Sequence, residues 1–372
     1  MKSNYKRLGD YIQQVDVRNV DDKRYELLGV SVEKCFISSI ANTIGTDWHN
    51  YKIIKKGQFC YIPDTSRRGD KIGIAFLEDR EIGLVSAVYT VFEVYNINDL
   101  MPEYLMLWFK RPEFDRYARY HSHGSVREIF DWEEMCNVEL PVPSLDRQQK
   151  IVEAYKIIEN RIALKRKIND NLELQAETVF NKKIIKNNIY PFNESLDKNI
   201  NFINGLAMQN FRPKEGRKSY PVIKIRELTQ GFCDNSSEYC HTDIGESHTV
   251  NKGDLVFSWS GSLQAAFWTS ETCGLNQHLF KVVSYKYPKW LAYMWVKYHL
   301  LSFQRIAENK GTTFGHIKRE DLHNAQIKSL DFSAIESYDK TFSPIVESII
   351  ANATELHFLM KLQRLVLSQL SR

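Results

Sequence analysis

The chain of 372 residues repeats itself once along its length. Shifting the sequence by 187 positions places Tyr104–Lys110 (YLMLWFK) on Leu291–Lys297 (LAYMWVK), so that a tryptophan and a lysine coincide. The same shift, without a gap, places Asn137 on Asn324. Self-similarity in a constant register is typical of a tandem duplication. The sequence therefore predicts two similar folding units with a pseudo-two-fold relation.

Each copy ends in a long segment with helical character. No glycine or proline lies between Pro143 and Pro191, and apolar residues there follow a three-four spacing with charges between them, which predicts a long amphipathic helix. The second copy repeats this apolar seam as far as Arg372, and Ser343–Pro344 has the residue types of an N-cap and a first helical position. We therefore expect the second helix to restart or kink at Pro344.

Two apolar seams of this length need a partner. The simplest arrangement packs them on each other as an antiparallel coiled coil that separates two lobes. The alternative is that each helix packs on its own lobe. The residues expected in the core of the helix pair are Ile158, Ile162, Leu172 and Val179 of the first copy, and Ile345, Ile349, Leu359 and Val366 of the second.

The remaining segments are rich in Tyr, Phe, Trp, Val and Ile in short runs separated by Gly, Asn and Asp, which is typical of β-rich lobes. We predict an α+β chain with four parts: a globular domain at 1–143, a spacer helix at 144–186, a second globular domain at 187–331, and a second spacer helix at 332–372. Trp108 and Trp295 are expected in the two cores. The predicted strands cover 57–62, 72–76, 84–94, 221–225, 253–258 and 277–283, and the predicted lobe helices cover 102–119 and 288–308.

Charge and composition place the chain among soluble globular proteins. Lys and Arg exceed Asp and Glu by 50 to 46, a net charge of +4 that does not by itself indicate a nucleic-acid partner. No segment approaches the length of apolar chain needed for a membrane span, and the first residues lack the apolar core of a signal peptide. We expect a cytoplasmic protein whose six cysteines are reduced and mostly buried.

Sequence motifs for catalysis are absent. The chain has no phosphate-binding GxxxxGK[ST], no GxGxxG, no HExxH and no GxSxG, and it lacks the motifs of a DNA amino-methyltransferase. Pro63–Asp64 followed by Glu78–Arg80 only partly matches a nuclease site, because the final lysine is missing. His121 and His123 have no further metal ligand nearby in the sequence. We predict no catalytic residue and no metal site.

Polar loops with cations recur at matching places in both copies. They cover 65–71 and 119–127 in the first copy, and 209–214, 258–264 and 310–318 in the second. Arg and Lys bind phosphates or guanine, and Asn and Gln pair with adenine, so such loops suit DNA; the alternative is an ordinary solvated loop. The candidate DNA-contacting residues are Arg67, Arg68, Lys71, His121, His123, Ser125 and Arg127 in the first copy, and Gln209, Asn210, Arg212, Lys214, Ser260, Ser262, Gln264, Thr312, Thr313, His316 and Lys318 in the second.

Several segments resemble the specificity subunit of type I restriction-modification systems, and the resemblance covers nearly the whole chain. One departure is Ile327–Leu330, where the family's second junction commonly carries prolines. The similar segments are LGDYIQQVDVRN from Leu8, GSVREIFDWEEMCNVELPVPSLDRQQKIV from Gly124, GDLVFSWSGSL from Gly253, LNQHLFKV from Leu275 and GTTFGHIKREDL from Gly311.

This resemblance implies a non-catalytic subunit whose two lobes are target-recognition domains, each reading one half of a bipartite sequence in double-stranded DNA. It implies that the helices set the spacing and dock methyltransferase subunits, two of them, through outward positions such as Lys165 and Glu173. S-adenosylmethionine, ATP and Mg²⁺ would belong to partner methyltransferase and motor-nuclease subunits, with no cofactor on this chain and no membrane partner. The alternative is a coiled-coil scaffold whose lobes bind a ligand other than DNA.

Overall fold

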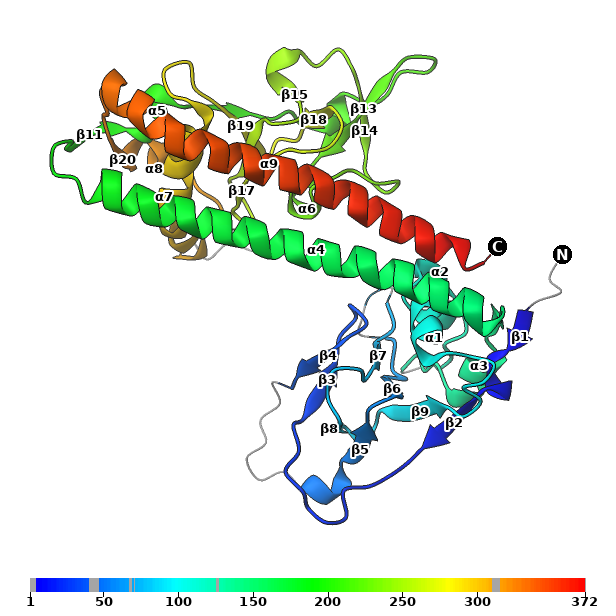
Figure 1. Ribbon diagram of the computed structural model, residues 1–372. Helices are drawn as coiled ribbons and strands as arrows, with labels where there is room; N and C mark the ends of the chain where they lie inside the picture. The colour runs from blue at the N-terminus through cyan, green and yellow to red at the C-terminus, as the bar shows by residue number, and fades with distance from the viewer. Residues whose placement is uncertain are drawn as a thin grey trace. The chain divides into compact units, whose positions relative to one another are not determined.

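The computed structural model describes residues 5–39, 47–66, 69, 71–124, 127–309 and 315–371 (Figure 1). Contacts divide the chain into two compact units, Met1–Glu159 with Leu362–Arg372, and Asn160–Lys361. Because these units divide within the long helices, the four-part division made from the sequence stays a prediction. No helix in the described ranges has the length and apolarity needed to cross a membrane.

The first unit contains a four-stranded antiparallel sheet in the order β2-β9-β6-β7. A second group of strands joins β3 to β4 and β5 to β8, and β1 pairs with β10. The elements are β1 (Tyr5–Arg7), β2 (Ile12–Val15), β3 (Leu28–Val30), β4 (Phe36–Ser38), β5 (Lys52–Lys55), β6 (Gln58–Tyr61), β7 (Ile74–Phe76), β8 (Ile82–Val85), β9 (Thr90–Val94), α1 (Pro102–Phe109), α2 (Pro112–Tyr120), α3 (Trp132–Asn137) and β10 (Glu139–Pro141).

The second unit has a four-stranded antiparallel sheet in the order β12-β19-β16-β17 and a second four-stranded sheet in the order β14-β13-β18-β15. Strands β11 and β20 form a separate pair. The elements are β11 (Phe192–Ser195), α5 (Leu196–Asn199), β12 (Asn201–Asn204), β13 (Ser219–Ile223), α6 (Ile225–Gln230), β14 (Tyr239–His241), β15 (Thr249–Val250), β16 (Leu255–Ser258), β17 (Ala265–Phe267), β18 (Cys273–Leu275), β19 (Leu279–Val283), α7 (Lys289–Asn309), α8 (Arg319–Asn324) and β20 (Gln326–Lys328).

The two units share this topology strand for strand. The sheet order β2-β9-β6-β7 of the first unit corresponds to β12-β19-β16-β17 in the second. The β1–β10 pair likewise corresponds to β11–β20, and the β5–β8 pair corresponds to β15–β18. In the first unit, an isolated parallel bridge joins Leu27 to Leu84. It occupies the position at which β13 runs parallel to β18 in the second unit. The turns match as well, since Gly57 before β6 and Gly253 before β16 have φ angles of 87° and 85°, which a residue with a Cβ rarely adopts.

Aromatic rings fill equivalent places in the two cores. In the first unit, Phe59 and Phe92 from neighbouring strands stack at 4.9 Å, and Phe109 of α1 meets Phe59 edge-on at 5.9 Å. In the second, Phe257 and Phe280 from neighbouring strands lie 6.3 Å apart. Trp108 and Trp295, predicted to be core residues, are both buried. All six cysteines are free thiols, and four of them are buried.

Two long helices carry the seams predicted from the sequence. They are α4 (Leu145–Phe180), followed by a π-helical turn at Asn181–Ile185, and α9 (Phe332–Gln369). Within the second unit they are antiparallel, since Lys165 Nζ donates to Asn352 Oδ1 at 2.8 Å and Tyr338 Oη donates to Lys183 O at 3.2 Å. Of the predicted seam, Ile158, Ile162 and Ile349 are buried, while Leu172, Val179, Ile345, Leu359 and Val366 are half-buried.

Three expectations about elements were wrong. Residues 84–94 were expected to form one strand, but they contain the end of β8 and the whole of β9. These two strands pair with different partners, β8 with β5 and β9 with β6. Residues 102–119 form two helices, because Pro112 has no N–H and holds Arg111 in an extended conformation at φ −75° and ψ 137°. Helix α9 begins at Phe332 and runs through Pro344, which is exposed, so the helix does not restart there, and the alternative of a kink at Pro344 stays a prediction.

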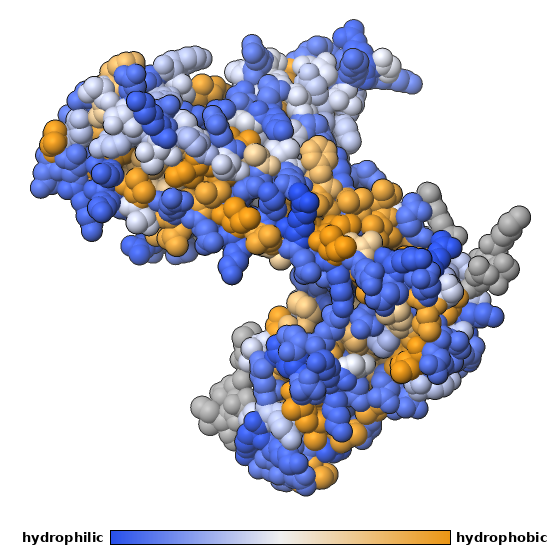
Figure 2. All heavy atoms as spheres, viewed as in Figure 1, coloured by the Kyte–Doolittle hydropathy of each residue, from blue (hydrophilic) through white to orange (hydrophobic). Residues whose placement is uncertain are grey.

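Apolar side chains also reach the surface of the long helices. Figure 2 shows hydrophobic residues gathered over α4. In the second unit the exposed large apolar residues of these helices include Leu164 and Leu174 on α4 and Phe358 on α9. Exposed leucines on a helix that already buries another face leave an apolar surface for a partner.

Candidate nucleic-acid interface

In the first unit, two of the predicted polar loops lie side by side. The loop after β6 and the loop between α2 and α3 are joined by an antiparallel bridge between Asp64 and Ile129. Thr65 strengthens the junction, because its N–H donates to Glu128 O at 3.0 Å and its hydroxyl lies 2.9 Å from Ser122 Oγ. The backbone of both loops is therefore held, while side chains around the junction reach the surface.

The predicted residues of the first unit lie on or beside these loops. Lys71 Nζ forms a 2.7 Å ion pair with Glu33, and Arg127 is exposed. His121 Nδ1 lies 3.0 Å from a carboxylate oxygen of Glu134, and His123 Nε2 lies 3.8 Å from the other oxygen. Nothing in the described ranges forms a group of three or more ligands that could hold a metal ion. Three predicted residues, Arg67, Arg68 and Ser125, lie outside the described residues.

The second unit repeats this junction at matching positions. The loop after β16 is joined to the segment before α8 by an antiparallel bridge between Ser260 and His316. Gly261 N–H donates to Gly315 O at 2.9 Å, and Ile317 N–H donates to Trp259 O at 3.0 Å. The two loop pairs are thus built by the same backbone contact in both copies.

The predicted residues of this junction differ in exposure. Ser260 is buried, with Oγ 3.1 Å from His278 Nδ1, whereas Ser262 and Lys318 are exposed. The half-buried Gln264 donates through its side-chain amide to Thr229 Oγ1 of α6. Thr312 and Thr313 lie outside the described residues.

The loop at 209–214 occupies another part of the second unit. Its Gln209, Asn210 and Arg212 side chains are exposed. Phe211 O accepts from His241 N–H at 3.0 Å, and Lys214 Nζ lies 3.8 Å from an Asp243 carboxylate oxygen. This loop therefore contacts β14 and the segment after it, and the four predicted residues here form a separate group from those at the Ser260–His316 bridge.

Trp259 is a candidate that the sequence did not single out. Its indole N–H lies 3.1 Å from Asn204 Oδ1 and 3.2 Å from Gln277 O, so the half-buried ring is fixed in place. The ring centroid lies 5.8 Å from that of His278 and 6.3 Å from that of His316. A tryptophan beside the loop junction was visible in the sequence, but its fixed orientation depends on contacts from distant strands.

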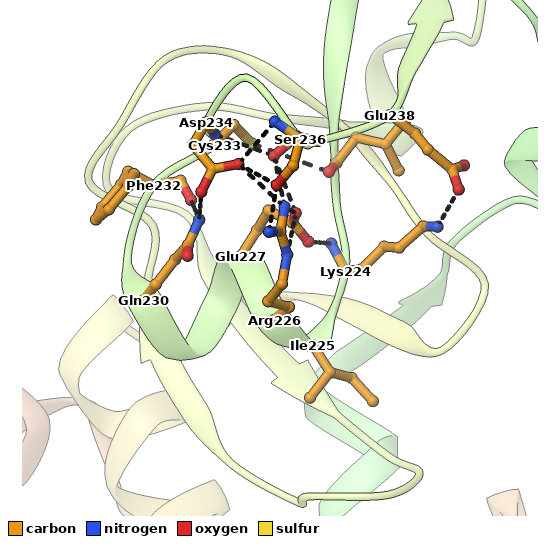
Figure 3. Close-up of polar contacts among 12 residues, drawn as sticks. Lys224, Ile225, Arg226, Glu227, Gln230, Phe232, Cys233, Asp234, Ser236 and Glu238 are labelled. Carbon is orange, nitrogen blue, oxygen red and sulfur yellow. Dashed lines mark hydrogen bonds and ion pairs between the residues drawn. The ribbon is translucent and has the colours of Figure 1, made fainter. Parts of the chain in front are cut away.

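A polar cluster holds the segment around α6 beside this loop (Figure 3). The buried Glu227 carboxylate accepts from Ser237 Oγ at 2.9 Å, from Lys224 N–H at 3.2 Å and from the Arg226 guanidinium. Arg226 also reaches Asp234 at 3.2 Å. Because each hydrogen bond to a buried carboxylate offsets part of its desolvation cost, the cluster fixes the loop that follows α6. The first unit has no counterpart of α6 among its described elements.

The Asp234 carboxylate makes this cluster sensitive to acid. Burial by itself raises the pKa of Asp234, but hydrogen bonds from Ser236 and the charge of Arg226 outweigh it and hold the pKa below its usual value of 3.8. A carboxylate with a lowered pKa stabilises the fold fully above its unfolded-state pKa, and this stabilisation is lost as pH falls through the folded value. We expect the Ser236 amide proton, which donates to Asp234 Oδ1 at 3.0 Å, to titrate below pH 3.8 in NMR spectra. Asp234→Asn should abolish this titration, and a midpoint above the usual value would contradict the assignment.

The cations at these loops are held only weakly by their intrachain partners. Arg119 Nη1 donates to Gly69 O at 2.7 Å, and its ion pair with Glu128 is 3.7 Å long. The pairs of Lys71 and Lys214 involve exposed side chains. Exposed ion pairs contribute about 0–1 kcal/mol, so exchanging them for contacts to a phosphate costs little.

Comparisons with known proteins agree on one group. A family model described as the type I restriction modification DNA specificity domain matches residues 25–174. The type I restriction enzyme MjaIX specificity subunit of Methanocaldococcus jannaschii is 24% identical over 296 residues, which are 73% of this chain and 68% of that protein. The EcoBI specificity subunit of Escherichia coli is 32% identical over 88 residues, which are 24% of this chain and 18% of that protein.

A solved structure supports the fold. The crystal structure of a type I restriction-modification system S subunit from M. genitalium has a TM-score of 0.54 and 12% identity, and the match covers 99% of this chain and 96% of that chain. The fold and the matched domain together define the class of this protein, which is a protein that contains a DNA specificity domain. The chain is similar to specificity subunits of type I restriction-modification systems, and its residues 25–174 match their DNA specificity domain.

Proposed function

We propose that each unit reads one half of a bipartite sequence in double-stranded DNA. The observation that carries this proposal is the recurrence of one loop junction, Asp64–Ile129 in the first unit and Ser260–His316 in the second. Duplicated loop pairs on a common scaffold, with different side chains, suit the reading of two different half-sites. The fixed backbone lowers the ordering cost of binding, and the polar side chains supply base and phosphate contacts.

The two long helices act as the spacer between the half-sites in this proposal. Both helices are close to the length expected from the sequence, with 36 residues in α4 and 38 in α9. A rigid spacer places two half-sites on one face of the duplex at a centre-to-centre distance of about 10 bp. The antiparallel contacts within the second unit support a stiff pair of helices.

The helices also provide docking surfaces for partner subunits in this proposal. The exposed Leu164, Leu174 and Phe358 suit contacts with two methyltransferase subunits. Of the polar positions expected to contact them, Lys165 pairs with Glu355 at 2.8 Å and Glu173 with Lys297 at 2.9 Å, so these two already have partners within the chain. Methyltransferase and motor-nuclease subunits would bring S-adenosylmethionine, ATP and Mg²⁺, and the complex would work in the cytoplasm.

A footprint of the complex tests the bipartite reading. The full chain, assembled with methyltransferase subunits of a type I restriction-modification system, is bound to a DNA fragment that carries its target. We expect two protected stretches whose centres lie about 10 bp apart. One continuous stretch of base-specific protection, or none above random DNA, would contradict the proposal.

Removing two exposed cations of the second unit should change the salt dependence of binding. We expect Arg212→Ala with Lys318→Ala to weaken DNA binding and to reduce the slope of log K against log salt by about 0.9 for each phosphate that the protein no longer neutralises. Among the residues that the structure describes, the exposed Lys150 of α4 pairs only with Asp146 four residues away, and Lys150→Ala is the matched control. Titrations at several salt concentrations measure the slope, and an equal slope in all three proteins would exclude these side chains from the phosphate contacts.

A further inference from the structure

A pocket of about 360 Å³ lies in the first unit. Its walls come from the β1–β10 strand pair and from the ends of α1 and α2 that meet at Pro112. Tyr5, Trp108 and Phe114 form an aromatic lining, and Arg111 and Asn137 add polar groups.

The Arg111 guanidinium in this pocket has almost no polar partner. Its residue is 5% exposed, and the guanidinium lies 4.1 Å from the centroid of the Trp108 ring. Its only ion pair in the described part of the chain joins Nε to Glu113 at 3.5 Å, and this buried Nε has no hydrogen-bond partner there. The buried Nε–H group has therefore lost its hydration without gaining a hydrogen-bond partner.

Two further features favour a negative charge at this position. Burial lowers the pKa of Arg111, and the nearby Glu113 opposes this lowering only in part. Arg111 is itself the N-cap residue of helix α2, and its side chain accepts no hydrogen bond from the helix N–H groups. A helix N-terminus attracts anions.

The duplication provides an internal comparison. The second unit has the corresponding pocket, where Phe192, Asn324 and Ala325 stand at the places of Tyr5, Asn137 and Val138. Tyr298 occupies the place of Arg111, and its ring stacks with Phe192 at 6.3 Å. The hollow is thus a feature of the fold in both units, while the buried cation is an addition in the first.

We propose that the first-unit pocket binds a planar carboxylate attached to a flat apolar group. The forked N–H donors of arginine match a carboxylate, and the aromatic walls cover the apolar part. The carboxylates of Glu113 and Glu139 also line the pocket and oppose any anion, so a ligand with a single negative charge suits it better than a polyanion such as DNA, which they would repel more strongly. The ligand would be either a free aromatic acid or a carboxylate presented by a protein segment.

Calorimetric titration of the full chain tests the proposal with benzoate and with its neutral analogue benzamide. We expect benzoate to bind at least ten-fold more tightly than benzamide, and Arg111→Met to abolish this preference while Arg111→Lys keeps part of it. Tyr298→Phe, in the second pocket, is the matched control and should leave benzoate binding unchanged. Equal affinity for benzoate and benzamide in the unaltered chain would overturn the proposal whether or not the variants fold.

A second pair of probes separates the two sources of the carboxylate. N-acetyl-Ala-Phe with a free carboxylate is compared with its C-terminal amide. Tighter binding of the acid peptide than of benzoate assigns the pocket to a protein segment, and weaker binding assigns it to a free aromatic acid. If the acid peptide and its amide bound equally while benzoate and benzamide also bound equally, no carboxylate site would exist. None of these measurements depends on DNA binding.

Discussion

Asp115→Ala is expected to lower the free energy of unfolding of the first unit by about 3–5 kcal/mol. The Asp115 carboxylate lies 2.5 Å from Lys34 Nζ, with both side chains largely buried, and it also accepts from Ile72 N–H at 3.1 Å. Removing it leaves a buried ammonium whose remaining hydrogen bond runs to Ile72 O at 2.9 Å. Burial already lowers the pKa of Lys34 despite the charge of Asp115, so the loss of that charge is costly.

An exposed pair provides the control for this prediction. Lys150 Nζ lies 2.7 Å from Asp146, with both side chains more than two-thirds exposed. We expect Asp146→Ala to change stability by about 0–1 kcal/mol. The free energy of unfolding of both variants is measured by denaturant unfolding, followed by hydrogen exchange of first-unit peptides. Equally small losses in Asp115→Ala and Asp146→Ala would contradict the prediction that burial makes the Lys34–Asp115 pair important for stability.

Phe342→Ala should destabilise the second unit by about 3–5 kcal/mol. The Phe342 ring is fully buried and stacks on Trp290 of α7 at 4.5 Å with an angle of 10° between the planes. It also meets Phe180 at the end of α4 edge-on at 6.3 Å. Truncating it opens a cavity where α4, α7 and α9 meet, so one side chain ties both long helices to this unit.

The same helix contains a matched control. Phe332 begins α9 and is 81% exposed, so Phe332→Ala should change stability by less than about 0.5 kcal/mol. Hydrogen exchange of second-unit peptides at increasing denaturant measures the difference. Similar losses of unfolding free energy in Phe342→Ala and Phe332→Ala would show that the effect comes from helix propensity and not from the aromatic contact.

Much of the fold was predictable because it depends on regular spacing. The shift of 187 residues predicted two similar units, and the repeated apolar seam predicted both long helices, although α9 contains Pro344. Side-chain burial within the helices was less predictable, because a three-four pattern does not fix which of two neighbours faces inward. Val346 and Leu367 are buried, whereas the predicted Ile345 and Val366 beside them are half-buried.

Proline and polar residues were harder to interpret from the sequence. Pro112 divides a helix, while Pro344 lies inside one, and only packing against other elements decides between these outcomes. The candidate loops were recognised by composition, but the bridges that join them link residues 65 and 56 positions apart, 64 to 129 and 260 to 316. Neither the fixed ring of Trp259 nor the buried guanidinium of Arg111 has a local sequence signal.

Selection of bound sequences from a random DNA pool tests the central proposal most directly. The chain, assembled with its methyltransferase subunits, is compared with Arg127→Ala in the first unit and Gln264→Ala in the second. The proposal predicts an interrupted motif, relaxed in one half by the first variant and in the other half by the second, with unchanged spacing. An uninterrupted motif, or a change in both halves caused by either single variant, would contradict it.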